Sequence, residues 1–308
     1  MRTWCYTDSN HIKMTDYGLM AALFGIRSEA APDGLRSEAS DAACGTHLKA
    51  EGGPRMSDAK ILAVAGKGGV GKTSVSAAMV RLLTERYPDR SILAIDADPA
   101  VGLSTALGIE AGETLDDIRK EITGEVSERG GEGVSDILES VKGRLLAATD
   151  HRQGYDFFAI GRPEAAGCYC AVNTYLRQVI SLLIHDYDYV VIDSEAGIEQ
   201  VNRRVLEKVT HLLLVTDASR KGTKVVQTIK QVADELVMYE KCGAIINRVL
   251  DGTAMEQIEL GDIPVLAVIG EDPSQTEFDI LGRSVFDLPA DSAILSGTKE
   301  ALEKLEII

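Results

Sequence analysis

The sequence lacks any apolar run approaching the roughly 18 residues that a membrane-spanning helix needs, and its N-terminus lacks the pattern of a secretory signal. Aromatic residues make up only 5% of the 308 residues, and 48 acidic side chains outnumber 32 basic ones. The resulting net charge of −16 repels nucleic-acid phosphates and anionic lipid. The composition therefore argues against nucleic-acid and membrane partners and favours a cytoplasmic protein.

Cysteine is also scarce and scattered, which excludes a disulfide framework. The five cysteines are Cys5, Cys44, Cys168, Cys170 and Cys242. In a reducing compartment such thiols stay reduced and are able to bind metal.

Residues 1–55 differ from the rest of the chain in their hydrophobic pattern, because they show no sustained strand or helix periodicity. A Gly-Gly-Pro stretch at 52–54 closes the segment, and Met56 then leads directly into an apolar strand. We expect residues 1–55 to be a disordered extension or sequence upstream of the true start. We expect residues 56–308 to form the folded domain.

From residue 60 onward, short Val/Ile/Leu runs alternate with amphipathic stretches. The expected strands are 60–65, 91–96, 155–160, 188–193, 211–217, 242–247 and 264–269. The expected helices lie near 72–86, 173–185, 199–208, 222–237 and 275–283, with surface helices in 111–150 and a final helix over 298–308. Strands that are apolar throughout are covered on both faces. The alternation predicts an α/β fold with a mostly parallel sheet of seven or eight strands and helices on both faces.

The segment Gly66–Thr73 reads G-K-G-G-V-G-K-T and stands between an apolar strand and helical sequence. Its glycines let successive backbone N–H groups point at phosphate oxygens. Lys72 would reach the β- and γ-phosphates, and the Thr73 hydroxyl would bind Mg²⁺. The motif predicts a P-loop ATPase whose nucleotide contacts come from Gly66, Gly68, Gly69, Val70, Gly71, Lys72, Thr73 and Ser74.

A second lysine, Lys67, follows the first glycine of this loop, and a single-chain phosphate site does not need it. This pattern resembles the deviant Walker A family, which includes the MinD, ParA and Mrp ATPases and the nitrogenase Fe proteins. The resemblance implies a homodimer in which Lys67 contacts the ATP of the partner chain. ATP hydrolysis would then be coupled to dimerisation.

Three further strand ends fit the same family. Asp98 of Asp96-Ala97-Asp98-Pro99 resembles the switch I aspartate, which would orient the attacking water or a water ligand of Mg²⁺. Asp193 ends a strand that resembles the Walker B strand and would hold Mg²⁺. Asn247 resembles the asparagine that bonds adenine, and Pro273 the loop that lines the base. We therefore expect catalysis by Lys67, Lys72 and Asp98.

Cys168 and Cys170 form a C-x-C pair. Two such thiolates bind one soft metal from one side, and a pair from each of two chains supplies the four ligands that zinc or nickel prefers. Two buried, inert cysteines are the alternative. The surrounding stretch 161–173 and Asp193–Glu199 resemble CooC-type nickel-insertion ATPases, although Gln200 stands where many members have histidine.

That resemblance covers residues 60 to about 295. It implies an ATP-driven metallochaperone that carries Ni²⁺, or Zn²⁺, on the cysteine pair and delivers it to apo carbon monoxide dehydrogenase or a related nickel enzyme. One alternative is an Fe-protein-like electron donor, which needs cysteines on two segments. A second is a MinD/ParA-type positioning ATPase, which needs a basic surface or a basic amphipathic C-terminal helix.

Overall fold

The computed structural model describes residues 59–308 except 99, 101, 111, 129–142, 146, 153, 162–179, 182, 195–208, 238 and 251–254. The expected extension 1–55 and its boundary with the folded domain lie outside this range. The predicted helix at 199–208 and most of the one at 173–185 lie outside it as well.

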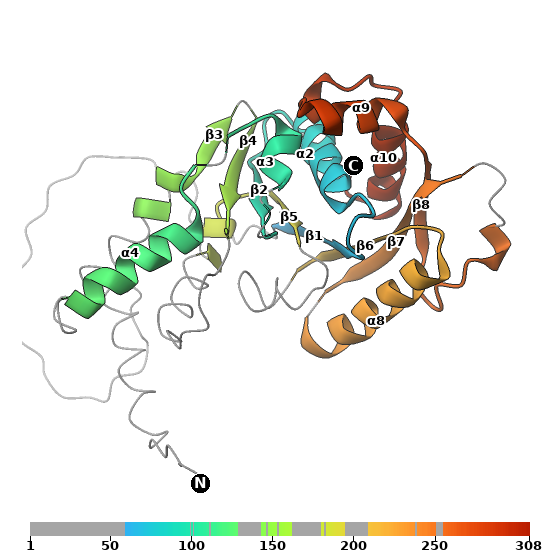
Figure 1. Cartoon of the computed structure of the whole chain (residues 1–308), viewed down its shortest axis with the longest axis horizontal. Helices are drawn as coiled ribbons and strands as arrows, with labels where there is room; N and C mark the ends of the chain where they lie inside the picture. The colour runs from blue at the N-terminus through green and yellow to red at the C-terminus, as the bar shows by residue number, and fades with distance from the viewer. Residues whose placement is uncertain are drawn as a thin grey trace, which may run out of the picture. The chain divides into compact units, whose positions relative to one another are not determined.

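An eight-stranded sheet forms the centre of the described fold, in the order β3-β4-β2-β5-β1-β6-β7-β8 (Figure 1). Neighbouring strands are parallel except β3 and β4, which are antiparallel. The strands are β1 (Lys60–Gly66), β2 (Ile92–Asp96), β3 (Asp150–Arg152), β4 (Tyr155–Ala159), β5 (Tyr189–Asp193), β6 (His211–Thr216), β7 (Lys241–Val249) and β8 (Val265–Gly270). The predicted α/β fold with a mostly parallel sheet is confirmed, and seven of its strands match the predicted ones closely. The short β3 was not predicted.

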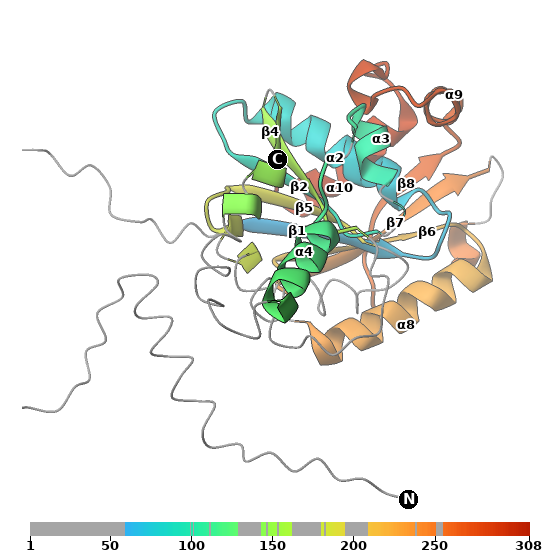
Figure 2. The same cartoon turned by 60° about the vertical axis from the view of Figure 1, so that its left-hand side comes forward.

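Helices cover both faces of this sheet (Figure 2). One face carries α2 (Lys72–Arg86), α3 (Gly102–Leu107) and α10 (Ala293–Lys304), and the other carries α4 (Leu115–Glu128) and α8 (Arg220–Leu236). Successive side chains of β1 point to opposite faces of the sheet, and both faces are apolar. Leu62 and Val64 pack on the α2 side, and Ala63 and Ala65 pack on the α8 side. All four side chains are fully buried. The remaining elements are η1 (Met255–Gln257), α9 (Pro273–Leu281) and η2 (Val285–Asp287).

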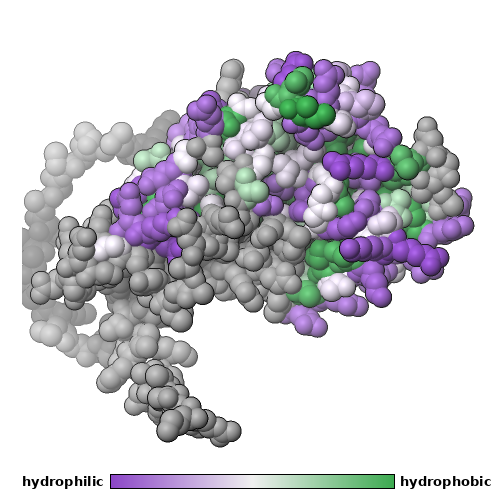
Figure 3. All heavy atoms as spheres, viewed as in Figure 1, coloured by the Kyte–Doolittle hydropathy of each residue, from purple (hydrophilic) through white to green (hydrophobic). Residues whose placement is uncertain are grey.

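Two predicted helices differ from the structure. The final helix starts at Ala293, earlier than the predicted 298, because the Ser292 side chain caps it by accepting a hydrogen bond from the Leu295 N–H. Within 111–150, α4 is more than a surface helix, since Leu115 and Ile118 lie in the core. On the face shown in Figure 3, the described surface is largely hydrophilic, and its apolar side chains lie in small patches.

His211 is a titratable group buried at the start of β6, and it should make the fold sensitive to acid. Burial, together with the charges of Lys241 and Lys60, lowers the pKa of His211 to about 4. An unfolded histidine titrates near 6.5. Between these values the unfolded state binds more protons, so stability falls as the pH drops through this window.

We expect His211→Gln to remove this part of the pH dependence. Between pH 7.5 and pH 5 the wild type should lose about 2 kcal/mol more free energy of unfolding than the variant. Urea unfolding at both pH values measures the difference. The comparison at pH 7.5 reports the effect of packing alone, and equal losses in the two proteins would contradict the prediction.

Candidate functional site

The segment Gly66–Thr73 forms the turn between β1 and α2, at the carboxyl end of the sheet (Figure 1). Gly66 has a φ of 153°, and a Cβ there would lie 2.0 Å from the Val215 carbonyl oxygen of β6. Gly71 has a φ of 92° and precedes the first residue of α2. No side chain of the described residues caps this helix start, so its first N–H groups can bind an anion.

Thr73 and Asp193, the two residues predicted to hold Mg²⁺, lie in direct contact. The Thr73 hydroxyl donates to Asp193 Oδ2 at 2.7 Å, and the Ser76 hydroxyl donates to Asp193 Oδ1 at 3.0 Å. Lys72 is almost buried at 8% exposure, and its Nζ donates to the Lys67 carbonyl oxygen at 3.3 Å. The helix start therefore presents a hydroxyl, a carboxylate and an ammonium group at one place.

A second buried carboxylate, Asp96, lies beside Asp193. The two residues end β2 and β5 and are partners in the strand register. Burial, followed by repulsion from Asp193, raises the pKa of Asp96 to about 7. Burial is also the main cause that raises the pKa of Asp193 to about 6. Carboxylate and hydroxyl oxygens are the donors that Mg²⁺ prefers, so this group of side chains fits the predicted cation.

Asp96, for which no role was predicted, also shapes the loop that carries Asp98. Its Oδ1 accepts a hydrogen bond from the Asp98 N–H at 3.0 Å, and its Oδ2 accepts one from the Leu103 N–H at 2.8 Å. Asp98 itself is partly exposed, and its carboxylate accepts from the Ala100 N–H at 2.9 Å. The signal for Asp96 was its place as the last residue of an apolar strand.

Lys67 lies against an acidic residue of its own chain. Its Nζ is 2.7 Å from Oδ2 of Asp217, the residue that follows β6. The two side chains are 27% and 29% exposed, so the ion pair lies at the edge of the phosphate loop. Asp217 was not predicted from the sequence.

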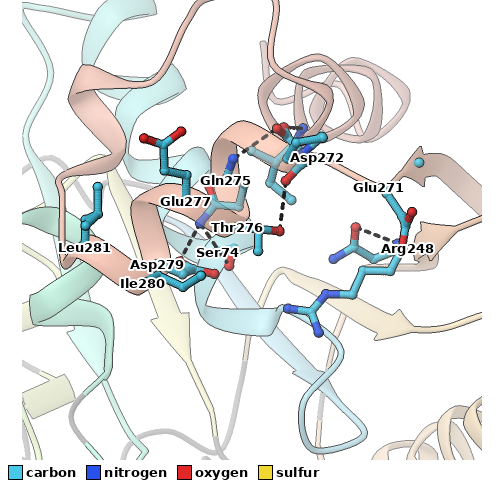
Figure 4. Close-up of a pocket in the computed structure, with 14 residues that line it drawn as sticks. Ser74, Arg248, Glu271, Asp272, Gln275, Thr276, Glu277, Asp279, Ile280 and Leu281 are labelled. Atoms are coloured by element: carbon cyan, nitrogen blue, oxygen red, sulfur yellow. Dashed lines mark hydrogen bonds between the residues drawn. The ribbon is translucent and has the colours of Figure 1, made fainter.

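A cavity of about 570 Å³ adjoins the loop on the side of β7 and α9 (Figure 4). Asn247, Pro273 and Ser74, all predicted to contact the nucleotide, line it together. Pro273 begins α9, so it belongs to a helix rather than to a loop. Arg248 and Gln275 line the same cavity and were not predicted, and Figure 4 shows Gln275 directed at Ser74.

The predicted nickel ligands Cys168 and Cys170 lie outside the described residues. The Mg²⁺ group described above has only two carboxylates, and within the described ranges no three or more His, Cys, Asp or Glu side chains come together to hold a metal ion. Cys242 is half-buried on β7, and burial raises the pKa of its thiol to about 12. It therefore stays protonated and is a poor metal ligand. No helix in this part of the chain is long and apolar enough to cross a membrane.

Known structures share this fold. MinD from Pyrococcus horikoshii, solved with Mg-ADP, superposes with a TM-score of 0.58 at 24% identity, over 80% of this chain and 96% of that one. A ParA family ATPase from Chlorobium tepidum superposes with a TM-score of 0.58 at 23% identity, over 79% and 98%. At these identities the likeness concerns the fold alone.

The chain is also similar in sequence to known proteins. The chain is 37% identical to an uncharacterized ATP-binding protein of Methanocaldococcus jannaschii, over 80% of this chain and 98% of that protein. It is 29% identical to the carbon monoxide dehydrogenase accessory protein CooC of Rhodospirillum rubrum, over 78% and 88%. Residues 61–285 match the CobQ/CobB/MinD/ParA nucleotide binding domain. The chain therefore belongs to the CobQ/CobB/MinD/ParA family of nucleotide-binding domains.

Proposed function

We propose that the protein is a dimeric, Mg²⁺-dependent ATPase that acts as a metallochaperone. It would bind nickel through Cys168 and Cys170 and insert it into apo carbon monoxide dehydrogenase or a related nickel enzyme. The observation that carries this proposal is the C-x-C pair in a chain that is similar to CooC over 88% of the length of CooC.

The geometry of the phosphate loop supports the nucleotide half of the proposal. Lys72 would neutralise the β- and γ-phosphates, while Thr73 and Asp193 would hold the cation. Bound Mg²⁺ would supply charge neutralisation at the phosphates. Asp98 would orient the attacking water, and Asn247 and Pro273 would contact the base in the 570 Å³ cavity. Lys67 would leave Asp217 to contact the ATP of the partner chain.

The metal half depends on the dimer, because two thiolates are too few for a stable nickel or zinc site. The pair from each chain would supply four sulfur ligands across the two-fold axis. ATP binding and hydrolysis would then assemble and release the metal site. In this scheme Ni²⁺, or Zn²⁺, is cargo rather than a resident cofactor.

A MinD/ParA-type positioning ATPase is an alternative that the family and the fold also allow. A membrane-binding protein of this type needs a basic amphipathic helix that is free to bind lipid. Here the C-terminal α10 packs into the core, with Ala301 and Leu302 fully buried. The net charge of −16 also disfavours binding to anionic lipid or DNA.

Metal titration of the full chain tests the proposal. The wild type should bind nickel in a dimer, and Cys168→Ala/Cys170→Ala should weaken nickel binding at least about 100-fold while ATP binding is kept. Cys242→Ala is the matched control, since it removes a cysteine that burial keeps protonated. Metal analysis measures the bound nickel, and light scattering measures the mass of the oligomer, each with and without ATP. Unchanged nickel stoichiometry in the double variant would refute the proposal that Cys168 and Cys170 bind the metal.

A further inference from the structure

The end of β7 contacts the phosphate loop through two consecutive residues. The Asn247 side chain is 5% exposed, and its Nδ2 donates to the Val70 carbonyl oxygen at 2.9 Å. Nη1 of Arg248 donates to the Gly69 carbonyl oxygen at 2.8 Å. The Arg248 N–H in turn donates to Asn247 Oδ1 at 3.0 Å, which fixes the orientation of the asparagine amide. Two successive carbonyl groups of the loop are thus held from one strand end.

The backbone of Arg248 is unusual. Its φ of 60° lies in the left-handed region, which residues with a Cβ rarely adopt. The pairing of β7 with β8 is irregular between Ile246 and Val249, so the strand is distorted at this point. Strained backbone of this kind persists where the surrounding contacts require it, and it is concentrated at functional sites. Here the distortion directs the arginine side chain toward the loop.

We propose that Arg248 is a positioning residue for nucleotide binding, which acts by holding the phosphate loop in its binding conformation. The reason is the planarity of the peptide bond. In a trans peptide the C=O and the following N–H point in opposite directions. A hydrogen bond to the Gly69 oxygen therefore directs the Val70 N–H away from β7, and the bond from Asn247 to the Val70 oxygen does the same for the Gly71 N–H.

The loop tip needs such support because little else packs against it. Gly68 and Gly69 are exposed, and a Cβ at either position would meet no atom within 4 Å. Glycine backbone without contacts samples many conformations. Ordering that backbone when the ligand binds would lower affinity, whereas a loop that is already held avoids this loss.

Three variants of the full chain test the proposal. Hydrogen exchange of the loop amides is measured without nucleotide, and ADP affinity is measured by calorimetry. Arg248→Ala and Arg248→Gly should both increase loop exchange and weaken ADP binding by about tenfold. Arg248→Gly suits the left-handed backbone, so it separates loss of the guanidinium from misfolding. Arg248→Lys keeps a donor and should restore much of both properties.

Gln275→Ala is the control on the opposite wall of the cavity. It should weaken ADP binding and leave exchange of the loop amides unchanged. Wild-type exchange in both the alanine and glycine variants would overturn the proposal, and so would faster exchange with unchanged ADP affinity. The inference rests on the nucleotide half of the proposed function alone. A wild-type protein that fails to bind ADP would refute that half, while the exchange measurement still reports whether Arg248 holds the loop.

Discussion

Lys72→Ala should lower the rate of ATP hydrolysis at least about 100-fold, because the ammonium group would stabilise charge on the phosphates in the transition state. Stability should change less than activity. In the structure Lys72 Nζ makes a long hydrogen bond, of 3.3 Å, to the Lys67 carbonyl oxygen, although the side chain is buried and its charge favours the Asp193 carboxylate. Phosphate release and thermal melting of the same samples measure the two effects separately.

Lys299→Ala is a suitable control for this variant, since Lys299 lies exposed on α10. Its hydrolysis rate should equal that of the wild type. Hydrolysis by Lys72→Ala at a rate near the wild type would mean that the loop does not act as a phosphate site. A large drop in melting temperature would mean that Lys72 is chiefly structural.

Lys67→Ala should also lower hydrolysis about 100-fold, but with ATP binding kept within a few-fold. The reason is that Lys67 would act on the ATP of the partner chain and would contribute little to binding the ATP in its own chain. In the wild type, the rate should rise more than linearly with protein concentration if, as proposed, the active form is a dimer. In Lys67→Ala this upward curvature should disappear. Wild-type rates in Lys67→Ala would contradict a role in the dimer.

Asp217→Asn is the matched variant for Lys67, because it releases the lysine without removing it. An ion pair whose side chains are 27% and 29% exposed contributes less than about 1 kcal/mol. Freeing Lys67 should therefore favour the dimer by no more than about fivefold. Sedimentation with ATP measures this shift. Weaker dimerisation in Asp217→Asn would show that Asp217 supports the dimer instead of competing with it.

The sequence predicted the parallel strands well, because each is an apolar run that only a doubly covered sheet can bury. It did not predict β3, which is three polar residues that pair with the edge of β4. Nothing local in Asp150–Arg152 resembles a strand, and the pairing partner alone creates it. The start of α10 was also misplaced, because the Ser292 cap carries little signal without its helix.

The residues of the site also fall into two groups, those that the sequence predicts and those that only the fold reveals. Gly66–Thr73 is a contiguous motif, so its residues could be identified from spacing alone. The contacts between Lys67 and Asp217 and between Arg248 and Gly69 join residues 150 and 179 positions apart. Which of them meet depends on the order of strands in the sheet, and a single sequence does not specify that order. Asp96 was missed for this reason, since its significance comes from lying beside Asp193.

The burial of α2 has a mechanical consequence. Most of its residues from Lys72 to Leu83 are buried, and it packs against α3, η2, α10 and the sheet. A helix held on so many sides cannot shift without breaking close-packed contacts. The phosphate end of a bound nucleotide would thus rest on a fixed support. Displacements that accompany the chemical cycle, and any force exerted on a second chain, have to arise elsewhere in the molecule.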